Sequence, residues 1–541
     1  MKLKYIGLLG LLIGFNACNE PEDVIIDFEG EQSEDVEVQA PALTAGSANF
    51  STYVAVGNSL TAGYTDGALF KAAQENSLTN MLANKFALVG GGDFTQPLMN
   101  DNFGGLLAGG GQIQETRFVF NGTGPQRLIE LNPGASPTTD IFVNNPTGPF
   151  NNMGVPGAKA IHMVFQGYGN PGNLPDASPY FIRMTGATPN ASVLEMAMAQ
   201  NPTFFTLWAG NNDVLGYATT GGDGTNPITP KVQFDGAIGA LVGGLTSGGA
   251  QGVVANIPYV STIPHFTTVP FNPLDPANPE FAPQIPTLNS VFGAINQVFT
   301  ALGETDRIIE FSETEASGVV ILDENLDDLT VQIAGALGGS AEFKAFVVSL
   351  GLPEQASPLV AGLLGQTYGQ ARQATAADLL VLPSSSFIAT IDSDNITTLM
   401  GQGLPANLAG QFSANGVTLP LGDKWVLTPE EQAELKTATD EFNATIKAAA
   451  DGAGLAFVDA NALMQEIASS GYADGDFILT SDLVTGGAFS LDGVHPTAKG
   501  YAVLANQFLM AIDATYGSNF ESSESLLNVI DYPTNYSASL Q

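Results

Sequence analysis

The sequence predicts an α/β protein built on a parallel sheet that helices cover on both faces. Apolar runs of strand length recur along the chain, at Tyr53–Val56, Phe204–Trp208, Gly252–Ile257 and Leu455–Val458. Runs that are apolar throughout are typical of strands buried on both faces. Segments with helical spacing lie between these runs, and this alternation favours crossover connections and parallel pairing.

Three helices are expected from local signals. The segment Gln74–Phe86 has helical spacing, and a second helix begins with Thr428 as N-cap, Pro429 at the first position and Glu431 completing a capping box. We expect this second helix to stop at Gly452. A third should follow Pro496, because one face carries Tyr501, Leu504, Ala505, Phe508, Leu509 and Ile512.

The 541 residues exceed the usual size of one domain, and the 62 glycines and 32 prolines indicate extensive loops. We assign one domain to residues 49–515, with a C-terminal tail at 516–541. Two stretches interrupt the strand–helix rhythm and are expected to be insertions, at about 87–150 and 305–425.

The charge balance is strongly acidic. Lys and Arg together number 16 against 54 Asp and Glu, which gives a formal net charge of −38. Such a field repels phosphate backbones, so we expect no nucleic-acid partner. The excess of negative charge otherwise indicates only solubility.

The N-terminus carries a targeting pattern. MKLK is basic, Tyr5–Phe15 is apolar but too short to span a bilayer, and Ala17 precedes Cys18, the only cysteine of the chain. This pattern resembles a bacterial lipoprotein signal, in which residues 1–17 are removed and Cys18 is lipidated. An ordinary secretory signal with an incidental cysteine is the alternative. A sole cysteine excludes disulfides within the chain, which favours the anchor.

The residues after Cys18 extend this expectation. Residues 18–48 are acidic and poor in large apolar side chains, which predicts a disordered tether. The NEPED run directly after Cys18 resembles export signals of some surface lipoproteins. No other segment has 18 consecutive apolar residues, so the lipid would be the only membrane attachment. We therefore expect an extracytoplasmic protein, anchored at the outer membrane or cell surface.

Histidine is scarce, which narrows the search for a general base. The chain has three, His162, His265 and His495, and only His495 has an aspartate three residues ahead, in LDGVHPTAKG. That spacing can place the Asp492 carboxylate beside the imidazole, where it would fix the tautomer. Alone, Asp-x-x-His-Pro is more often a helix-start turn with a capping aspartate.

A serine, a glycine and an asparagine follow apolar or turn segments in positions that suit acyl transfer. Ser59 lies in YVAVGNSLTAGY, although the Gly-x-Ser-x-Gly elbow fails because Thr61 occupies the last position. Gly157 in NNMGVPGAKA can bring a backbone N–H close to a ligand, and the side chain of Asn212 in LWAGNNDVLGY can donate. Each segment taken alone is more often an ordinary loop.

Together and in this order, the motifs Gly-Asn-Ser-Leu, Asn-Met-Gly-Val-Pro-Gly-Ala, Gly-Asn-Asn-Asp and Asp-Gly-Val-His-Pro resemble the SGNH (GDSL-like) hydrolases. The resemblance implies a flavodoxin-like three-layer α/β/α sandwich with large insertions and a site at the carboxyl ends of parallel strands. It implies cleavage of carboxylic esters by an esterase, a lipase or an acyl-carbohydrate deacylase, through an acyl-enzyme and without a cofactor. The ester substrate would be an acyl lipid or an acylated carbohydrate.

The resemblance also implies roles for individual residues. Ser59 would be the nucleophile, His495 the general base and then acid, and Asp492 the group that orients it. The Ser59 and Gly157 backbone N–H groups and the Asn212 side chain would form the oxyanion hole. Asn58 departs from the family's usual aspartate, which leaves the local loop geometry less certain.

Other candidates are weaker. His162 and His265 sit beside apolar residues and are expected in core or loop positions. Asp392 and Asp394 resemble part of a calcium loop, but the EF-hand spacing and closing glutamate are absent, and we assign no metal site. A surface lipoprotein that binds carbohydrate or lipid without turnover is the alternative function, and an adhesion protein a more distant one. The oligomeric state stays open.

Overall fold

The computed structural model describes residues 40–475 and 477–540. The predicted signal peptide, the Cys18 lipidation site and most of the acidic tether lie outside these described residues. From Ala42 onward the chain forms one compact unit by its internal contacts.

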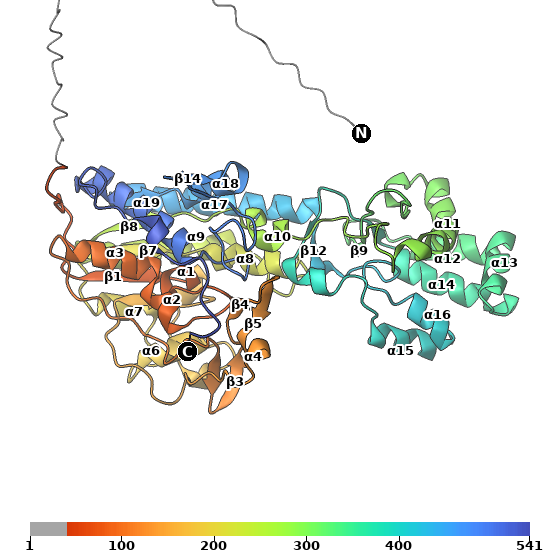
Figure 1. The fold of residues 1–541 in the computed structure, drawn as a ribbon, viewed down its shortest axis with the longest axis horizontal. Helices are drawn as coiled ribbons and strands as arrows, with labels where there is room; N and C mark the ends of the chain where they lie inside the picture. The colour runs from red at the N-terminus through yellow and green to blue at the C-terminus, as the bar shows by residue number, and fades with distance from the viewer. Residues whose placement is uncertain (1–39, 476, 541) are drawn as a thin grey trace, which may run out of the picture. The chain divides into compact units, whose positions relative to one another are not determined.

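A five-stranded sheet forms the centre of this unit (Figure 1). The strand order is β13-β8-β7-β1-β6, and every neighbouring pair is parallel. The bounds of these strands are Tyr53–Gly57 (β1), Asn152–Gly154 (β6), Phe204–Trp208 (β7), Gln251–Ala255 (β8) and Ala456–Val458 (β13). Numbered within the sheet, the order is 2-1-3-4-5, which is the doubly wound order of flavodoxin-like folds. The predicted fold class is therefore confirmed.

Helices cover both faces of the sheet and complete the three layers. On one face α3 and α19 contact each other, and on the other α9 contacts α5, α7 and α17. Between α9 and α17, the Phe234 and Phe442 rings stack with their centroids 3.9 Å apart. The bounds are Leu78–Ala87 (α3), Ala160–Val164 (α5), Val193–Met198 (α7), Lys231–Thr246 (α9), Pro429–Ala453 (α17) and Ala498–Tyr516 (α19).

Four of the five strands coincide with predicted apolar runs to within two residues. The predicted helix at Gln74–Phe86 is instead two helices, α2 (Lys71–Glu75) and α3, because Ser77 starts a new helix by accepting from the Asn80 N–H. The predicted stop at Gly452 was wrong. Helix α17 runs through it to Ala453 and ends at Gly454, whose φ of 66° is the left-handed conformation that glycine adopts freely.

Strand β6 was not predicted. Its three residues are fully buried, but the stretch is too short and too rich in Asn and Gly to show an apolar run. Gly154 must be small here, because a Cβ would lie 2.3 Å from the Ala62 nitrogen. Close packing against helix α1 (Ser59–Ala62) therefore accounts for the composition of this strand.

The first predicted insertion, at 87–150, forms loops and two small hairpins before the chain returns to the sheet. The hairpins pair β2 (Leu106–Ala108) with β3 (Gly111–Gln114) and β4 (Phe118–Phe120) with β5 (Pro125–Arg127), and α4 (Leu128–Leu131) follows. After β6 the chain adds α6 (Pro179–Thr185) and α8 (Asn211–Thr219).

The second insertion has a hydrophobic core of its own. This core extends from Val269 to Val426, so the insertion begins earlier than the predicted residue 305. It contains two short antiparallel strands, β9 (Val320–Leu322) and β10 (Ala371–Gln373), and Figure 1 shows its helices on one side of β9. The helices are α11 (Ile285–Leu302), α12 (Thr330–Gly339), α13 (Ala341–Ser349), α14 (Ser357–Tyr368), α15 (Ser393–Gly401) and α16 (Ala406–Gln411).

Short elements join this insertion to the sheet and close the domain. Helix α10 (Pro264–Thr267) leads into the insertion, and β11 (Leu379–Leu380) pairs with β12 (Val426–Leu427) where it ends. After β13 come α18 (Ala460–Ser469) and the hairpin of β14 (Tyr472–Asp474) and β15 (Phe477–Leu479). Within the described ranges, no single helix is long and apolar enough to cross a membrane, although the bent pair Ala341–Ser349 and Glu354–Tyr368 passes on length and composition.

Both ends of the described chain pack on the domain. Ser47 donates its backbone N–H to the Tyr516 carbonyl, and Thr44 donates to the Asn519 side chain, so the last residues of the predicted tether belong to the folded unit. The predicted C-terminal tail also packs closely. Arg117 donates to the carbonyls of Tyr536, Ser537 and Leu540.

Candidate active site

Ser59 stands at the carboxyl end of the central strand β1. All five residues of β1 are buried, and helix α1 begins at Ser59 itself. The Asn58 side chain caps this helix by accepting from the Leu60 N–H at 3.0 Å. A buried strand followed at once by a capped helix holds the Ser59 backbone in place, and its side chain lies at the switch point of strand order, where ligands bind in open parallel sheets.

The His495 side chain lies between Ser59 and Asp492. Its Nε2 is 2.9 Å from the Ser59 Oγ, and its Nδ1 is 2.8 Å from the Asp492 Oδ2. A carboxylate at Nδ1 favours the tautomer with the proton on that nitrogen, which leaves Nε2 to accept from the serine hydroxyl. The structure thus brings together the three predicted residues across a sequence separation of 436 between Ser59 and His495.

Asp492 is held as a carboxylate by a full set of donors. Burial alone would raise the pKa of Asp492, but the His495 side chain and several hydrogen bonds hold that pKa well below its usual range. Apart from the His495 ring, the donors are the backbone N–H groups of Gly67, Val494 and His495 and the Ser490 hydroxyl. An ionised Asp492 fixes the imidazole orientation and can stabilise an imidazolium.

Around these three residues lie supporting groups that the sequence did not predict. Tyr64 packs its ring 4.6 Å from the His495 ring, measured between centroids. Asp66 accepts from the Leu491 N–H, and its own N–H is bonded to the Ser490 hydroxyl. Ser490 could have been noticed two positions before Asp492 in the same motif. Asp66 and Tyr64 had no recognisable signal.

Asn212 faces the same cavity as Ser59 and His495. It is the second residue of helix α8, which follows strand β7, and its Nδ2 donates to the Ala158 carbonyl at 3.0 Å, which leaves a second amide hydrogen. Gly157 directly precedes Ala158, is exposed, and has a φ of 80°. The structure therefore places Asn212 at the cavity with Ser59, and Gly157 next to the residue that Asn212 holds.

Two cavities flank the His495 side chain. The one beside Ser59 has a volume of about 50 Å³ and mostly apolar walls, which include Trp208, Leu215, Val260, Ile263 and Met464. The second is a wider cleft of about 550 Å³ beside Asp492 and His495, and Arg127, Ser385 and Ser386 contribute to its lining. The last two serines belong to the second insertion, so that insertion shapes one side of the site.

Neither of the other two histidines lines the cavity beside Ser59. His162 accepts from the Lys159 N–H and stacks on Tyr168 at 4.7 Å. His265 is half-buried and lines the wider cleft, and its Nε2 is buried without a hydrogen-bond partner. Burial lowers the pKa of His265 to about 4, while the nearby Asp492 charge opposes the change.

The weak calcium interpretation of Asp392 is replaced by a structural role. Its side chain caps helix α15 by accepting from the Asn395 N–H at 2.7 Å. Among the described residues, the acidic group with the spacing of a metal site is elsewhere, at Glu324, Asp423 and Glu431.

A comparison with family models supports the resemblance drawn from the motifs. The model described as GDSL-like lipase/acylhydrolase matches residues 364–508. This stretch contains Asp492 and His495 but not β1 or Ser59. No curated protein and no solved structure matches the chain. The fold is of the α/β class, and residues 364–508 are similar to the GDSL-like lipase/acylhydrolase family, which supports an ester hydrolase in general terms.

Proposed function

We propose that this protein is a serine hydrolase of carboxylic esters, with Ser59 as nucleophile. The observation that carries the proposal is the Ser59–His495–Asp492 arrangement, with hydrogen-bond distances of 2.9 and 2.8 Å. His495 Nε2 takes the Ser59 proton while the Oγ attacks the ester carbonyl. His495 then gives that proton to the departing alcohol, and a water molecule activated by the same nitrogen cleaves the acyl-enzyme.

The negative charge that develops on the ester carbonyl oxygen during attack needs hydrogen-bond donors to stabilise it. We assign this to the backbone N–H of Ser59, to the free amide hydrogen of Asn212 and to the backbone N–H of Gly157. Each such donor is worth roughly 3 kcal/mol of transition-state stabilisation in acyl-transfer enzymes. Asn212 is supported by its place at the Ser59 cavity, and Gly157 by its neighbour's hydrogen bond to Asn212.

The two cavities favour a short acyl group on a polar alcohol. The apolar cavity beside Ser59 holds about 50 Å³, or roughly four water-sized groups, which suits an acetyl to butyryl chain. The wider cleft shares His495 with this cavity but not Ser59, and we place the alcohol portion of the ester toward it. Its Arg127 guanidinium, stacked 3.8 Å over the Phe118 ring, and its two serines can bind hydroxyl groups of an acylated carbohydrate.

The test measures hydrolysis of nitrophenyl acetate, butyrate and palmitate by the full-length protein in mild detergent. We expect the two short esters to be cleaved at least tenfold faster than palmitate, and Ser59→Ala to abolish turnover. Ser247→Ala, a change in an exposed serine at the end of α9, is the matched control and should leave the rates unchanged. Equal rates for wild type and Ser59→Ala would remove the nucleophile assignment and favour a binding protein. Faster cleavage of palmitate would favour a lipase.

We further propose that the protein acts outside the cytoplasm, anchored by a lipid on Cys18. The support is the sequence pattern around Cys18, because these residues lie outside the described structure. Cys18→Ala should shift the protein from the membrane fraction to the soluble fraction after export. Unchanged membrane association of Cys18→Ala would contradict the anchor, and Cys18→Ser, which equally lacks the thiol, checks that size is not the cause.

A further inference from the structure

Three carboxylates from separate segments converge beside the junction of the second insertion and the sheet. Glu324 follows strand β9, Asp423 precedes strand β12, and Glu431 lies in the first turn of α17. One carboxylate oxygen from each lies within 4.8 Å of the other two. Like charges at this separation repel, so either a bound cation or a shared proton must offset the repulsion.

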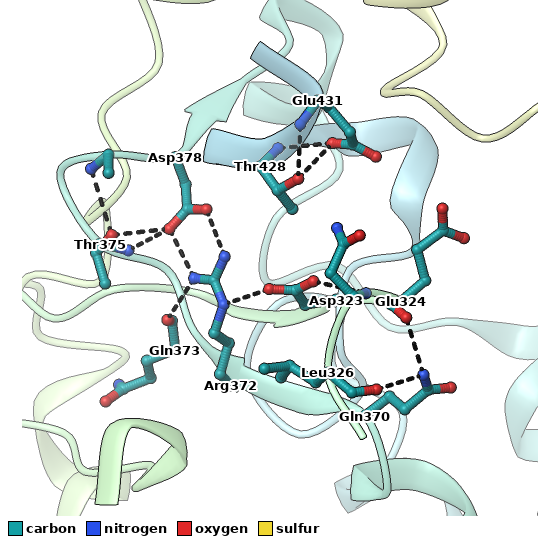
Figure 2. Close-up of polar contacts among 12 residues, drawn as sticks. Asp323, Glu324, Leu326, Gln370, Arg372, Gln373, Thr375, Asp378, Thr428 and Glu431 are labelled. Atoms are coloured by element: carbon teal, nitrogen blue, oxygen red, sulfur yellow. Dashed lines mark hydrogen bonds and ion pairs between the residues drawn. The ribbon is translucent and has the colours of Figure 1, made fainter. Parts of the chain in front are cut away.

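Glu431 supplies the observation that points to a ligand. This residue is only 5% exposed, and its Oε2 accepts from the Thr428 N–H and hydroxyl at 2.7 and 2.9 Å. Its Oε1 is buried and has no hydrogen-bond partner. Figure 2 shows this second oxygen pointing away from Thr428, without any interaction drawn to it, on the side where the Glu324 carboxylate lies. A buried carboxylate oxygen without a donor is costly unless something binds it.

No cationic side chain in the described structure neutralises the group. The guanidinium of Arg372 is paired with Asp323 and Asp378 instead, and it donates three hydrogen bonds of 2.7 to 2.8 Å to them (Figure 2). The Lys424 ammonium lies over the Trp425 ring, and no ion pair joins a described Lys or Arg to Glu324, Asp423 or Glu431.

The surroundings add negative charge. Asp223, on the loop after α8, and Asp323 both act electrostatically on the cluster. Burial and the neighbouring carboxylates raise the pKa of Asp423 to about 7, and burial raises the pKa of Glu431.

We propose that Glu324, Asp423 and Glu431 bind one calcium ion. Carboxylate oxygens are the ligands that Ca²⁺ prefers, at about 2.4 Å, so oxygens up to 4.8 Å apart fit on opposite sides of one ion. Mg²⁺ demands near-ideal octahedral geometry and usually keeps several waters, so a site with three carboxylates from separate segments favours Ca²⁺. The absence of histidine and cysteine from the group disfavours zinc.

The site would connect the insertion to the helix that carries Asn212. The loop after α8 approaches Glu431 so closely that a Cβ on Gly222 would lie 2.4 Å from the unpartnered Oε1. Gly221 is similarly close to the Asp423 carbonyl. A bound ion would hold the segment after β9, the segment before β12 and the start of α17 together, so calcium is expected to stabilise the folded chain.

The test is calcium binding by the full-length protein, measured by titration calorimetry and by thermal unfolding at pH 7.5. We expect one ion per chain, and a rise in unfolding temperature of about 3 °C or more in millimolar CaCl₂ relative to chelator. Glu431→Gln keeps the capping box, and Glu324→Gln changes an exposed residue that the fold tolerates. Each should weaken binding about tenfold or more, since each removes one charged ligand. Glu430→Gln, an exposed neighbour in the same helical turn, is the matched control and should bind like wild type.

Several results would overturn the proposal. One is the absence of binding heat together with equal unfolding temperatures in CaCl₂ and chelator, which would mean that shared protons relieve the repulsion instead. Another is unweakened binding in both Glu324→Gln and Glu431→Gln, which would place the ion elsewhere. An equal effect of MgCl₂ would overturn the assignment to calcium. None of these outcomes depends on ester hydrolysis, so this proposal stands or falls apart from the proposed function.

Discussion

The sheet region and the second insertion both bury charged side chains, but they use them differently. Beside the sheet, Asp492 directs its charge to His495, whose other nitrogen contacts Ser59. In the insertion, Arg372 is enclosed by Asp323 and Asp378 and contacts no cavity beside Ser59. Equal burial therefore has different consequences, because a change at the first site should alter reaction rate and a change at the second should alter stability. The predictions below test this distinction.

Asp492→Asn should have the largest effect. The asparagine carbonyl can still accept from the His495 N–H, but the neutral amide no longer stabilises an imidazolium. We therefore expect kcat for short esters to fall by about 10³- to 10⁴-fold. The measurement is kcat beside the unfolding temperature. A loss of stability with unchanged kcat per folded molecule would show that Asp492 serves the fold alone.

Arg372→Met should lower the free energy of unfolding by about 3–4 kcal/mol and leave kcat of the folded protein unchanged. Removing the guanidinium leaves two buried carboxylates without a cationic partner, which is the costly way to break a buried ion pair. Urea unfolding at 25 °C measures the change. Lys447→Met is the control, because its pair with Asp451 is exposed and should cost less than about 0.5 kcal/mol. Similar losses in the two variants would contradict the interpretation.

Asp66→Asn tests whether the buried Asp66 carboxyl makes the free energy of unfolding depend on pH. Burial, aided by the Asp492 charge, raises the pKa of Asp66 to about 7 in the folded chain. Because the unfolded chain releases this proton near pH 4, wild type loses stability as pH rises from about 4 to 7, and then no further. Relative to wild type, the variant should gain up to about 3 kcal/mol over that interval. A stability difference that is constant between pH 4 and 7 would contradict the raised pKa.

Asn58→Asp should have the smallest effect. The Asn58 Nδ2 donates to the Asn211 Oδ1 at 2.9 Å, and an aspartate lacks that donor unless the Asn211 amide rotates. We expect kcat/KM for butyrate esters to fall by no more than about fivefold, since one neutral hydrogen bond contributes about 1 kcal/mol. Asn58→Ala, which also loses the cap of α1, should lower kcat/KM further. A hundredfold loss in Asn58→Asp would show a more direct role for this residue.

The sequence predicted the sheet region well and the insertion poorly, for a physical reason. Strands buried on both faces must be apolar along their whole length, so Phe204–Trp208 was visible from composition alone. Strand β6 was missed because its environment selects small residues that resemble a loop. The insertion follows no repeated strand–helix order, and its limits depend on which core each side chain joins, which a linear pattern does not reveal.

The candidate site divides in the same way. Ser59, Asp492 and His495 could be predicted because each lies in a short motif whose order along the chain is informative. Asp66 and Tyr64 could not, since their importance arises from contacts with residues more than 400 positions away. The Gly157 position remains a prediction, and the acidic group at Glu324, Asp423 and Glu431 was invisible because its members come from three separate segments.

The contact between Ser59 and His495 joins the first strand of the domain to the turn before its last long helix. During synthesis, the serine leaves the ribosome hundreds of residues before its base exists, and the whole insertion must be accommodated between them. Closing so distant a pair comes late in folding, because non-local contacts carry the largest loop-closure cost. Any incomplete or truncated chain therefore carries an unpaired serine, and recovery of esterase activity after dilution from denaturant would report the arrival of the fully assembled fold.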